Sequence, residues 1–392
     1  MDSQFDARSV VIATRIYAPE PAAASFRLAA LARSIRDTGA RVTVLTTRPV
    51  GGRAAPEPGV AVRRWPVLRD RSGYVRGYLQ YMSFDIPLFF RLMLASRPDV
   101  VVVEPPPTSG FVVRLACALR RIPYVYYAAD IWSDAAESTG APAPVVRFVR
   151  VLERAALRSA ARVIAVTDGV AERVLAIAED ADVRVVANGV DTDIFTPDGA
   201  RRAEGPVAVY AGTTSEWQGA DIFIRALPRV LRSVPDARIV FVGQGSAWQG
   251  LAATAAELGL DRVEFVDVVP PREAAAWLRS ATVGLVSLKP DQGYDFAFPT
   301  KIYAALASGA PVLFAGPGPA AALVRSGRLG TAVDYDVDSV ADAMIANLTN
   351  PLDENARVAL AAWVDEHASL RQTAAKAAAV VVTGRASSRM RT

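Results

Sequence analysis

The sequence has little of what disulfides, metal centres and membrane spans require. Cys117 is its one cysteine, so no internal disulfide can form and a reducing compartment is expected. His367 is its one histidine, which leaves few nitrogen or sulfur ligands for a metal. No run reaches the roughly 18 apolar residues of a membrane span, and residues 1–8 lack a signal-peptide pattern. We therefore expect a soluble, cytoplasmic chain that needs no metal or other cofactor.

Lysine is also scarce. Lys289, Lys301 and Lys376 are the three lysines among 44 basic residues, so arginine is the usual cation and each lysine is conspicuous. The net charge of +4 is small, and nothing resembles a nucleic-acid-binding module. At 392 residues and 52% apolar content, the chain is long and apolar enough for two globular domains.

Short Val/Ile-rich runs alternate with amphipathic segments, a pattern typical of parallel sheets with helical crossovers. In the first half we predict strands at 10–17, 41–46, 99–104, 124–129, 162–167 and 183–187. In the second half we predict strands at 207–211, 238–242, 263–266, 283–288, 311–314 and 331–335. The α/β sequence therefore predicts two doubly wound Rossmann-like domains, 1–187 and 206–350, joined by a polar hinge at 188–205. Helices and a basic tail follow at 351–392.

Loops that follow strands should carry the chemistry, because ligands of wound sheets bind at the carboxyl ends of the strands. The loop with the most specific functional signal contains Phe298, Pro299, Thr300 and Lys301. Pro299 suits the first turn of a helix, whose free amides at residues 300–302 would bind an anion. A cation at this end opposes the helix dipole, so we expect a bound pyrophosphate to favour Lys301 there. The alternative is a solvated surface lysine.

Two glycine-rich loops belong with this site. Gly212, Thr213 and Thr214 follow the first strand of the second half, where backbone amides can approach phosphate. Gly243 and Gly245 follow the next strand and permit close approach of a flat base. The dinucleotide-binding fingerprint and the Walker loop are both missing, which disfavours dehydrogenases and ATPases.

The order of these and other motifs resembles the retaining family-4 glycosyltransferases, in particular the branch that builds O-antigens, capsules and exopolysaccharides. The motifs lie at residues 17–27, 129–132 (Ala-Asp-Ile-Trp), 188–191 (Asn-Gly-Val-Asp), 299–301 (Pro-Thr-Lys) and 307–312 (Ala-Ser-Gly-Ala-Pro-Val). The resemblance covers about residues 10–375. It implies a GT-B fold, with two domains facing a central cleft and C-terminal helices crossing back to the N-terminal domain. It also implies metal-independent transfer, with retention, from a nucleotide-diphosphate sugar such as a UDP-sugar.

The resemblance assigns roles to single residues. Lys301 would stabilise the leaving diphosphate, and Asp130 would orient an acceptor hydroxyl, with capping of the following turn as the alternative for Asp130. The residues named above in the loop at 298–301 and in the two glycine-rich loops would bind the donor. The expected acceptor-side residues are Glu20, Arg27, Glu104 and Trp132.

The chain departs from the family at two glutamates that contact the donor. Their positions are Phe296 and Ala304 here, and Asp295 is the nearest carboxylate, so we predict that Asp295 compensates. Relatives often carry a lysine after the first glycine loop, where this chain has Trp217 and Gln218. These losses keep a second hypothesis open, a catalytically weak nucleotide-sugar binder or partner-dependent subunit. A third is a sugar-nucleotide epimerase of the same shape, which the scarcity of histidines and paired carboxylates disfavours.

The expected acceptor is a glycan, a lipid-linked sugar or a small molecule. Arginines and aromatics are interleaved over residues 63–90, which suits an anionic membrane interface or a lipid-diphosphate acceptor. The alternative is an aromatic stripe that faces the core beside a solvated arginine face. We therefore expect a cytoplasmic location that includes peripheral contact with the inner face of the membrane.

Overall fold

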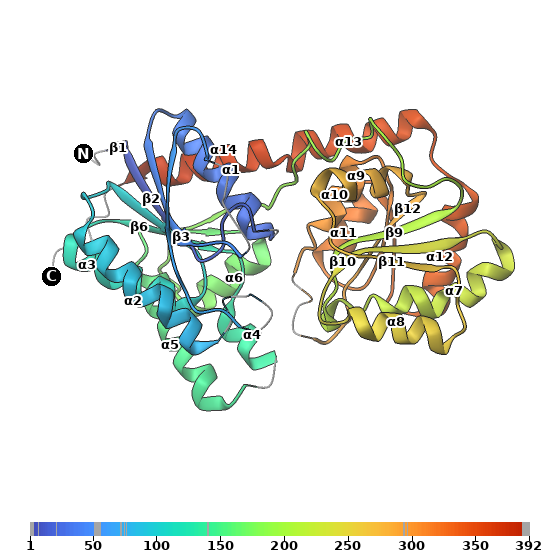
Figure 1. Cartoon of the computed structure of the whole chain (residues 1–392), viewed down its shortest axis with the longest axis horizontal. Helices are drawn as coiled ribbons and strands as arrows, with labels where there is room; N and C mark the ends of the chain where they lie inside the picture. Colours follow the sequence, from blue (N-terminus) through green and yellow to red (C-terminus); the bar gives the residue numbers. More distant parts are fainter. Residues whose placement is uncertain are drawn as a thin grey trace. The chain divides into compact units, whose positions relative to one another are not determined.

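A computed structural model describes residues 4–6, 8–20, 22–50, 56–70, 73, 75, 77–138, 141–292, 295 and 297–385. They form two compact units. Unit 1 is Met1–Asn188 together with Leu370–Thr392, and unit 2 is Gly189–Ser369. The chain thus passes from unit 1 to unit 2 at Asn188 and returns at Leu370 (Figure 1).

Unit 1 is built on a seven-stranded parallel sheet of order β4-β3-β2-β5-β6-β7-β8. The strands are β2 (Ser9–Ala13), β3 (Arg41–Thr47), β4 (Val60–Trp65), β5 (Val100–Val103), β6 (Tyr124–Ala128), β7 (Arg162–Ala165) and β8 (Val183–Val185). The chain winds outward from β2 in one direction and from β5 in the other, so the switch point of this sheet lies between β2 and β5. All four residues of β5 are buried valines, as expected of a strand covered on both faces.

The helices of unit 1 cover both faces of this sheet. They are α1 (Ala23–Asp37), α2 (Tyr78–Leu94), α3 (Pro107–Arg120), α4 (Trp132–Ser138), α5 (Ala143–Ser159), α6 (Asp168–Ile177) and α14 (Leu370–Val382). α1 packs against α14, whereas α3 packs between α2 and α5 (Figure 1). Two short strands near the ends of the chain, β1 (Gln4–Asp6) and β15 (Thr383–Arg385), pair antiparallel and form a separate two-stranded sheet.

Unit 2 contains a six-stranded parallel sheet of order β11-β10-β9-β12-β13-β14. Its strands are β9 (Val207–Thr213), β10 (Arg238–Gln244), β11 (Val263–Val266), β12 (Val283–Ser287), β13 (Val312–Ala315) and β14 (Gly330–Val333). Its helices are η1 (Glu216–Gln218), α7 (Asp221–Ser233), α8 (Trp248–Glu257), α9 (Pro271–Ser280), α10 (Lys301–Ala307), α11 (Pro319–Ser326), α12 (Val337–Thr349) and α13 (Glu354–Ala368). The switch point lies between β9 and β12. Successive residues of β9 point into two different apolar clusters, one on each face of the sheet.

The structure confirms the predicted α/β architecture of two wound sheets, and each of the twelve predicted strands is present. The first predicted strand was too long, since β2 ends at Ala13 and the hydroxyl of Thr14 bonds to the backbone of Ile16 instead. The edge strand β4 was not predicted; only its first residue, Val60, is buried, and the following residues alternate between exposed and partly exposed. Its arginines and tryptophan had been assigned to the interleaved segment at 63–90.

Candidate functional site

Lys301 is the first residue of α10, and its side chain lies at the carboxyl end of β9, beside the switch point of unit 2. Its Nζ donates to the Tyr210 hydroxyl at 2.7 Å, the Thr213 carbonyl at 2.8 Å and Gln218 Oε1 at 3.2 Å. The same nitrogen lies 4.2 Å from the centroid of the Tyr210 ring. Within the described part of the chain, no carboxylate forms an ion pair with this amine. Three neutral oxygens therefore hold the Lys301 amine at the edge where wound sheets bind ligands.

Desolvation lowers the pKa of Lys301 to about 7. The cause is the loss of water around a half-buried ammonium that gains no compensating negative charge. A bound anion would supply that charge and favour the protonated amine. The amine can therefore act as an electrostatic partner for a phosphate group that arrives from solution.

One of the three amides predicted to be free at residues 300–302 is bonded in the structure. α10 has seven residues, and the amide of Ile302 already donates to the Pro299 carbonyl at 3.1 Å. The side chain of Thr300, the residue before the helix, makes no capping hydrogen bond. The expectation of a free amide at Ile302 was wrong, and so was the placement of Pro299 in the first helical turn, since Pro299 lies two residues before α10.

The two glycine loops meet at adjacent strand ends. Gly212 and Gly243 are paired across β9 and β10, both with positive φ (123° and 139°). A Cβ on Gly243 would lie 2.4 Å from the Gly212 carbonyl oxygen, so only glycine permits this approach. The amide of Thr214 donates to the Gln244 carbonyl at 2.9 Å, so the prediction that this amide is available to phosphate was wrong.

Tyr210 and Gln218 are functional candidates that the sequence analysis did not assign. Gln218 Oε1 accepts from the Tyr210 hydroxyl at 2.9 Å and from the Ser215 amide at 3.2 Å, besides Lys301. Gln218 thus fixes the loop after β9 and orients the hydroxyl that contacts the lysine. In the sequence, Gln218 stood out only as a departure from the family pattern. Tyr210 lies inside β9, where nothing in the sequence distinguishes it from other strand residues.

The remaining donor-side predictions lie around the start of α10. Asp295 Oδ1 is buried and has no hydrogen-bond partner within the described residues. The Phe298 ring stacks on Tyr303, with centroids 5.0 Å apart. Ala304 packs against the apolar core of unit 2, so no acceptor replaces a glutamate at that position. Phe296 lies outside the described residues, and the compensating role of Asp295 stays a prediction.

Arg27 and Glu104, two predicted acceptor-side residues, are partners of each other in unit 1. The Arg27 guanidinium donates to Glu104 at 2.9 Å, and both side chains are buried. Glu104 also accepts from the Thr14 hydroxyl at 2.8 Å, which joins the ends of β2 and β5 at the switch point. Arg27 further donates to Asn188 Oδ1 at 3.2 Å and lies 5.0 Å from the Tyr127 ring centroid. Arg27 and Glu104 therefore form a buried ion pair at the switch point of unit 1, and their acceptor-side role stays a prediction.

Trp132 begins α4, and the carboxylate of Glu153 accepts from its amide at 2.8 Å and from the Ser133 amide at 3.0 Å. Glu153, not Asp130, therefore caps this helix, so the capping alternative for Asp130 was wrong. Asp130 is exposed. Desolvation by the surrounding protein nevertheless raises its pKa, opposed by Arg27 and reinforced by Glu104.

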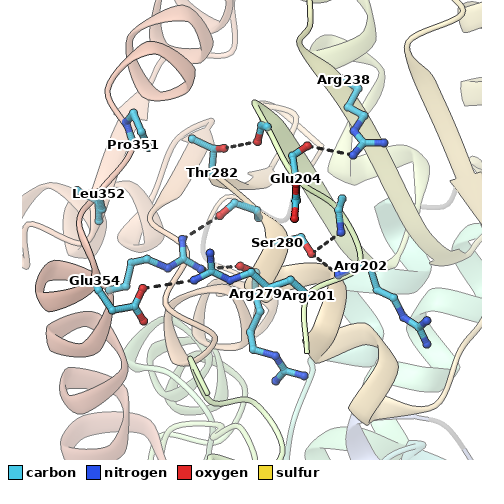
Figure 2. Close-up of a pocket in the computed structure, with 14 residues that line it drawn as sticks. Arg201, Arg202, Glu204, Arg238, Arg279, Ser280, Thr282, Pro351, Leu352 and Glu354 are labelled. Atoms are coloured by element: carbon cyan, nitrogen blue, oxygen red, sulfur yellow. Dashed lines mark hydrogen bonds and ion pairs between the residues drawn. The ribbon is translucent and has the colours of Figure 1, made fainter. Parts of the chain in front are cut away.

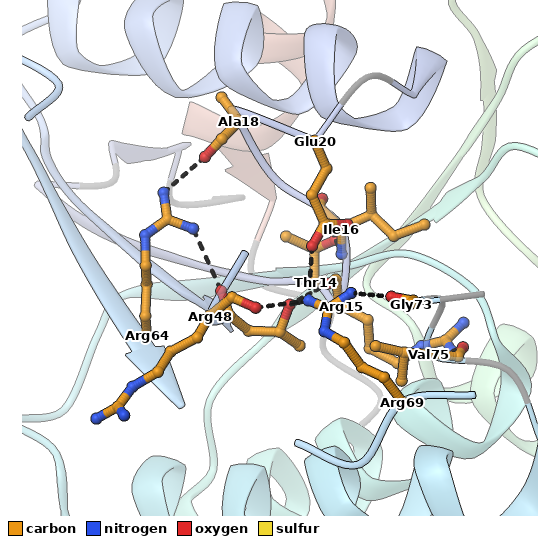
Figure 3. A network of polar contacts seen from close by, with 11 residues as sticks. Thr14, Arg15, Ile16, Ala18, Glu20, Arg48, Arg64, Arg69, Gly73 and Val75 are labelled. Atoms are coloured by element: carbon orange, nitrogen blue, oxygen red, sulfur yellow. Dashed lines mark hydrogen bonds and ion pairs between the residues drawn. The ribbon is translucent and has the colours of Figure 1, made fainter. Parts of the chain in front are cut away.

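Arg15, which follows β2, is a further residue that the sequence analysis missed. Its buried guanidinium lies 4.2 Å from the Tyr81 ring centroid and 5.9 Å from that of Trp132. It donates to the Val75 carbonyl at 3.0 Å (Figure 3). Arg15 lay inside the strand predicted at 10–17, so the rule that selects residues after strand ends did not apply to it until the structure ended β2 at Ala13.

Glu20 is bound by an arginine rather than free. Arg69 donates to Glu20 at 2.7 Å and to the Gly73 carbonyl at 2.7 Å, while Arg64 donates to the Ala18 carbonyl at 2.6 Å (Figure 3). These arginines connect the loop after β2 to β4 and to the segment that follows β4. The acceptor-side role of Glu20 stays a prediction.

A cavity of about 750 Å³ lies at the opposite, amino-terminal edge of the unit 2 sheet. Five arginines are among its lining residues: Arg201, Arg202, Arg238, Arg279 and Arg357. The buried Arg279 donates to the Thr196 and Ala200 carbonyls. Arg201 pairs with Glu354, as Figure 2 shows. The arginines that line the cavity therefore connect the segment before β9 to α9 and α13. The cavity is separate from the Lys301 site, which lies at the other edge of the sheet.

Two glycosyltransferase family models match the chain. The model described as glycosyl transferase 4-like domain matches residues 23–189, and that described as glycosyl transferases group 1 matches residues 205–350. Together they cover most of both units.

Curated relatives match the chain over part of their length. The GDP-mannose-dependent alpha-(1-6)-phosphatidylinositol monomannoside mannosyltransferase of Mycolicibacterium smegmatis is 33% identical over 174 residues, 41% of this chain and 46% of that protein. The chain spans about half the length of the curated relatives that it matches.

Solved structures match the chain over nearly its whole length and show the fold. Sucrose-phosphate synthase from Thermosynechococcus elongatus has a TM-score of 0.76 at 17% identity, covering 95% of this chain and 98% of that one. HepE from Anabaena, solved with UDP and glucose, has a TM-score of 0.69 at 17% identity over the same shares.

Proposed function

Since this chain belongs to the family-4 glycosyltransferases of the GT-B fold, we propose that it transfers a sugar from a nucleotide-diphosphate donor to an acceptor. Unit 2 binds the donor at the carboxyl end of β9, and unit 1 receives the acceptor near the ends of β2, β5 and β6. The further assignment to the O-antigen, capsule and exopolysaccharide branch stays a prediction from sequence.

The observation that carries the proposal is the Lys301 amine, held by Tyr210, Thr213 and Gln218 with no carboxylate partner in the described part of the chain. As the bond between sugar and diphosphate breaks, negative charge develops on the leaving diphosphate. A preorganised cation at that point stabilises the transition state more than the ground state. Lys301 fills this role in the proposed mechanism, and Asp130 orients the acceptor hydroxyl.

The relatives and the similar solved structures point to different nucleotides in the donor. The mycobacterial relatives are named for GDP-mannose, whereas HepE was solved with UDP. We retain a UDP-sugar as the proposed donor and test GDP-mannose beside it. We also propose that configuration is retained and that no metal takes part. No set of three or more metal-ligating side chains is placed together in the described ranges, and activity in the presence of EDTA tests this point.

For the acceptor we propose a lipid-linked or glycan hydroxyl compound, and for the location the cytoplasmic face of the membrane. No helix of the described residues meets the length and hydropathy that a bilayer span requires. The mannosyltransferase relative is named for a phosphatidylinositol mannoside, which supports a lipid-linked acceptor.

The test is binding and slow hydrolysis of candidate donors. We expect UDP-sugars to raise the melting temperature of the wild type and to release UDP slowly in the absence of acceptor. We expect Lys301→Ala to fold normally but to lower turnover about 100-fold or more. Lys289→Ala is the matched control, because Lys289 is an exposed lysine in a loop after β12.

Each alternative hypothesis has its own outcome. Donor binding with no hydrolysis and no transfer would support the catalytically weak binder. Conversion of a UDP-sugar to its epimer would support the epimerase. Normal turnover by Lys301→Ala would exclude Lys301 from the mechanism.

A further inference from the structure

One face of α2 carries large apolar side chains into solvent. They are more than half exposed (54–86%) and share one side of the helix, at spacings of seven, four and four: Leu79, Ile86, Phe90 and Leu94. The opposite side of α2 buries Phe84, Leu88 and Leu92 against the rest of unit 1. The buried side of α2 therefore makes the contacts that pack this helix within unit 1. These contacts do not explain why the opposite side carries large apolar residues.

The exposed apolar surface continues over the neighbouring helices. α3 packs against both α2 and α5, so the three helices lie side by side (Figure 1). α3 and α5 add five large side chains that are 41–61% exposed: Leu115, Leu119, Val145, Phe148 and Val151. We call the exposed surface of these three helices the α2–α3–α5 face. Large exposed apolar areas mark interaction sites in soluble proteins.

The charges on this face have one sign. The three helices contain seven arginines and two acidic residues, Asp85 and Glu153. Both acids are buried, Asp85 with the Ser109 hydroxyl at 2.5 Å and Glu153 with the first amides of α4. The exposed charges of these helices are therefore all positive. Arg147, Arg154 and Arg158 are exposed and have no ion-pair partner in the parts of the chain that the structure describes.

We propose that the α2–α3–α5 face docks on the surface of an anionic phospholipid bilayer. The apolar side chains would enter the boundary between headgroups and acyl chains, while the arginines contact lipid phosphates. Arginine suits this role, since its planar guanidinium binds phosphate oxygens in pairs and is weakly hydrated. A second copy of the chain is a poorer occupant, because two such faces would bring like charges together. The face lies outside the residues assigned to donor binding, so the proposal does not rest on Lys301.

The experiment is co-sedimentation of the full chain with vesicles. We expect binding to vesicles of phosphatidylcholine with 30 mol% phosphatidylglycerol, and at least tenfold weaker binding to pure phosphatidylcholine. The variant Phe90→Ser/Leu94→Ser/Phe148→Ser should bind the anionic vesicles at least tenfold more weakly. The variant Arg147→Glu/Arg154→Glu/Arg158→Glu should lose most of the preference for anionic lipid.

A matched control replaces exposed apolar residues of unit 2 by serine: Leu258→Ser/Val268→Ser/Val358→Ser. It should bind vesicles as the wild type does. Thermal unfolding and donor binding, both in detergent-free buffer, verify that each variant is folded and keeps its donor site. Wild-type protein that stays in the supernatant, or a Phe90/Leu94/Phe148 variant that binds normally, would overturn the proposal. A wild-type dimer that this variant dissociates, without vesicle binding, would assign the face to a second copy instead.

Discussion

The affinity for the donor should fall as the pH rises above 7, because the free enzyme then loses the positive charge of Lys301. The pKa of Lys301 is lowered to about 7 by desolvation, and no acid pairs with the amine in the described part of the chain. A donor diphosphate beside the amine favours the protonated form, so the pKa should rise on binding. The protonated enzyme is therefore the form that binds, and it becomes scarce with increasing pH.

The size of the effect follows from that pKa. At pH 8 about ten of eleven free enzyme molecules carry a neutral Lys301, so binding should take up about 0.9 proton. If the bound form stays protonated to pH 9, the apparent Kd should rise about fivefold from pH 7 to 8 and about 50-fold from pH 7 to 9. The latter corresponds to about 2.3 kcal/mol of binding free energy. The diphosphate of a nucleotide sugar does not titrate in this range, so the change belongs to the protein.

Isothermal titration calorimetry of the donor, at pH 8 in buffers of different ionisation enthalpy, measures the proton uptake directly. Lys301→Arg is the informative variant, because a guanidinium stays charged throughout this range and should remove both the uptake and the pH dependence. Lys289→Ala should keep both. The reasoning fails if the wild type takes up no proton at pH 8, or if Lys301→Arg takes up as much as the wild type.

Three further outcomes are expected. Arg27→Ala leaves the buried Glu104 without its partner at 2.9 Å, so the free energy of unfolding should fall by about 3–5 kcal/mol in urea titrations; an unchanged midpoint would contradict the buried pair. Gly245→Ala places a Cβ 1.8 Å from a neighbouring carbonyl oxygen and should lower the free energy of unfolding by about 1–3 kcal/mol. Gly250→Ala, with open space around its Cβ position, should not. Asp295→Ala should raise the donor Kd at least tenfold, about 1.4 kcal/mol, and an unchanged Kd in calorimetry would refute compensation by Asp295.

The sequence by itself determined the order of the strands along the chain and the type of both sheets. Runs such as Val100–Val103 are apolar on both sides of the strand, and only a sheet covered on both faces buries them. It also singled out Lys301 as a candidate, because a rare lysine follows a proline in a loop after a strand. These features are local, so neighbouring residues carry the whole signal.

The tertiary structure alone decided which side chains meet. Tyr210 and Gln218 contact a lysine more than 80 residues away, and Arg27 pairs with Glu104 across 77 residues. No local pattern encodes such contacts, since they depend on which strands become neighbours at the switch points. The sequence also could not show which side of α2 faces solvent, because this helix has apolar residues on both its buried and its exposed side. Only the packing of α2 on α3 separates the buried Phe84 from the exposed Phe90.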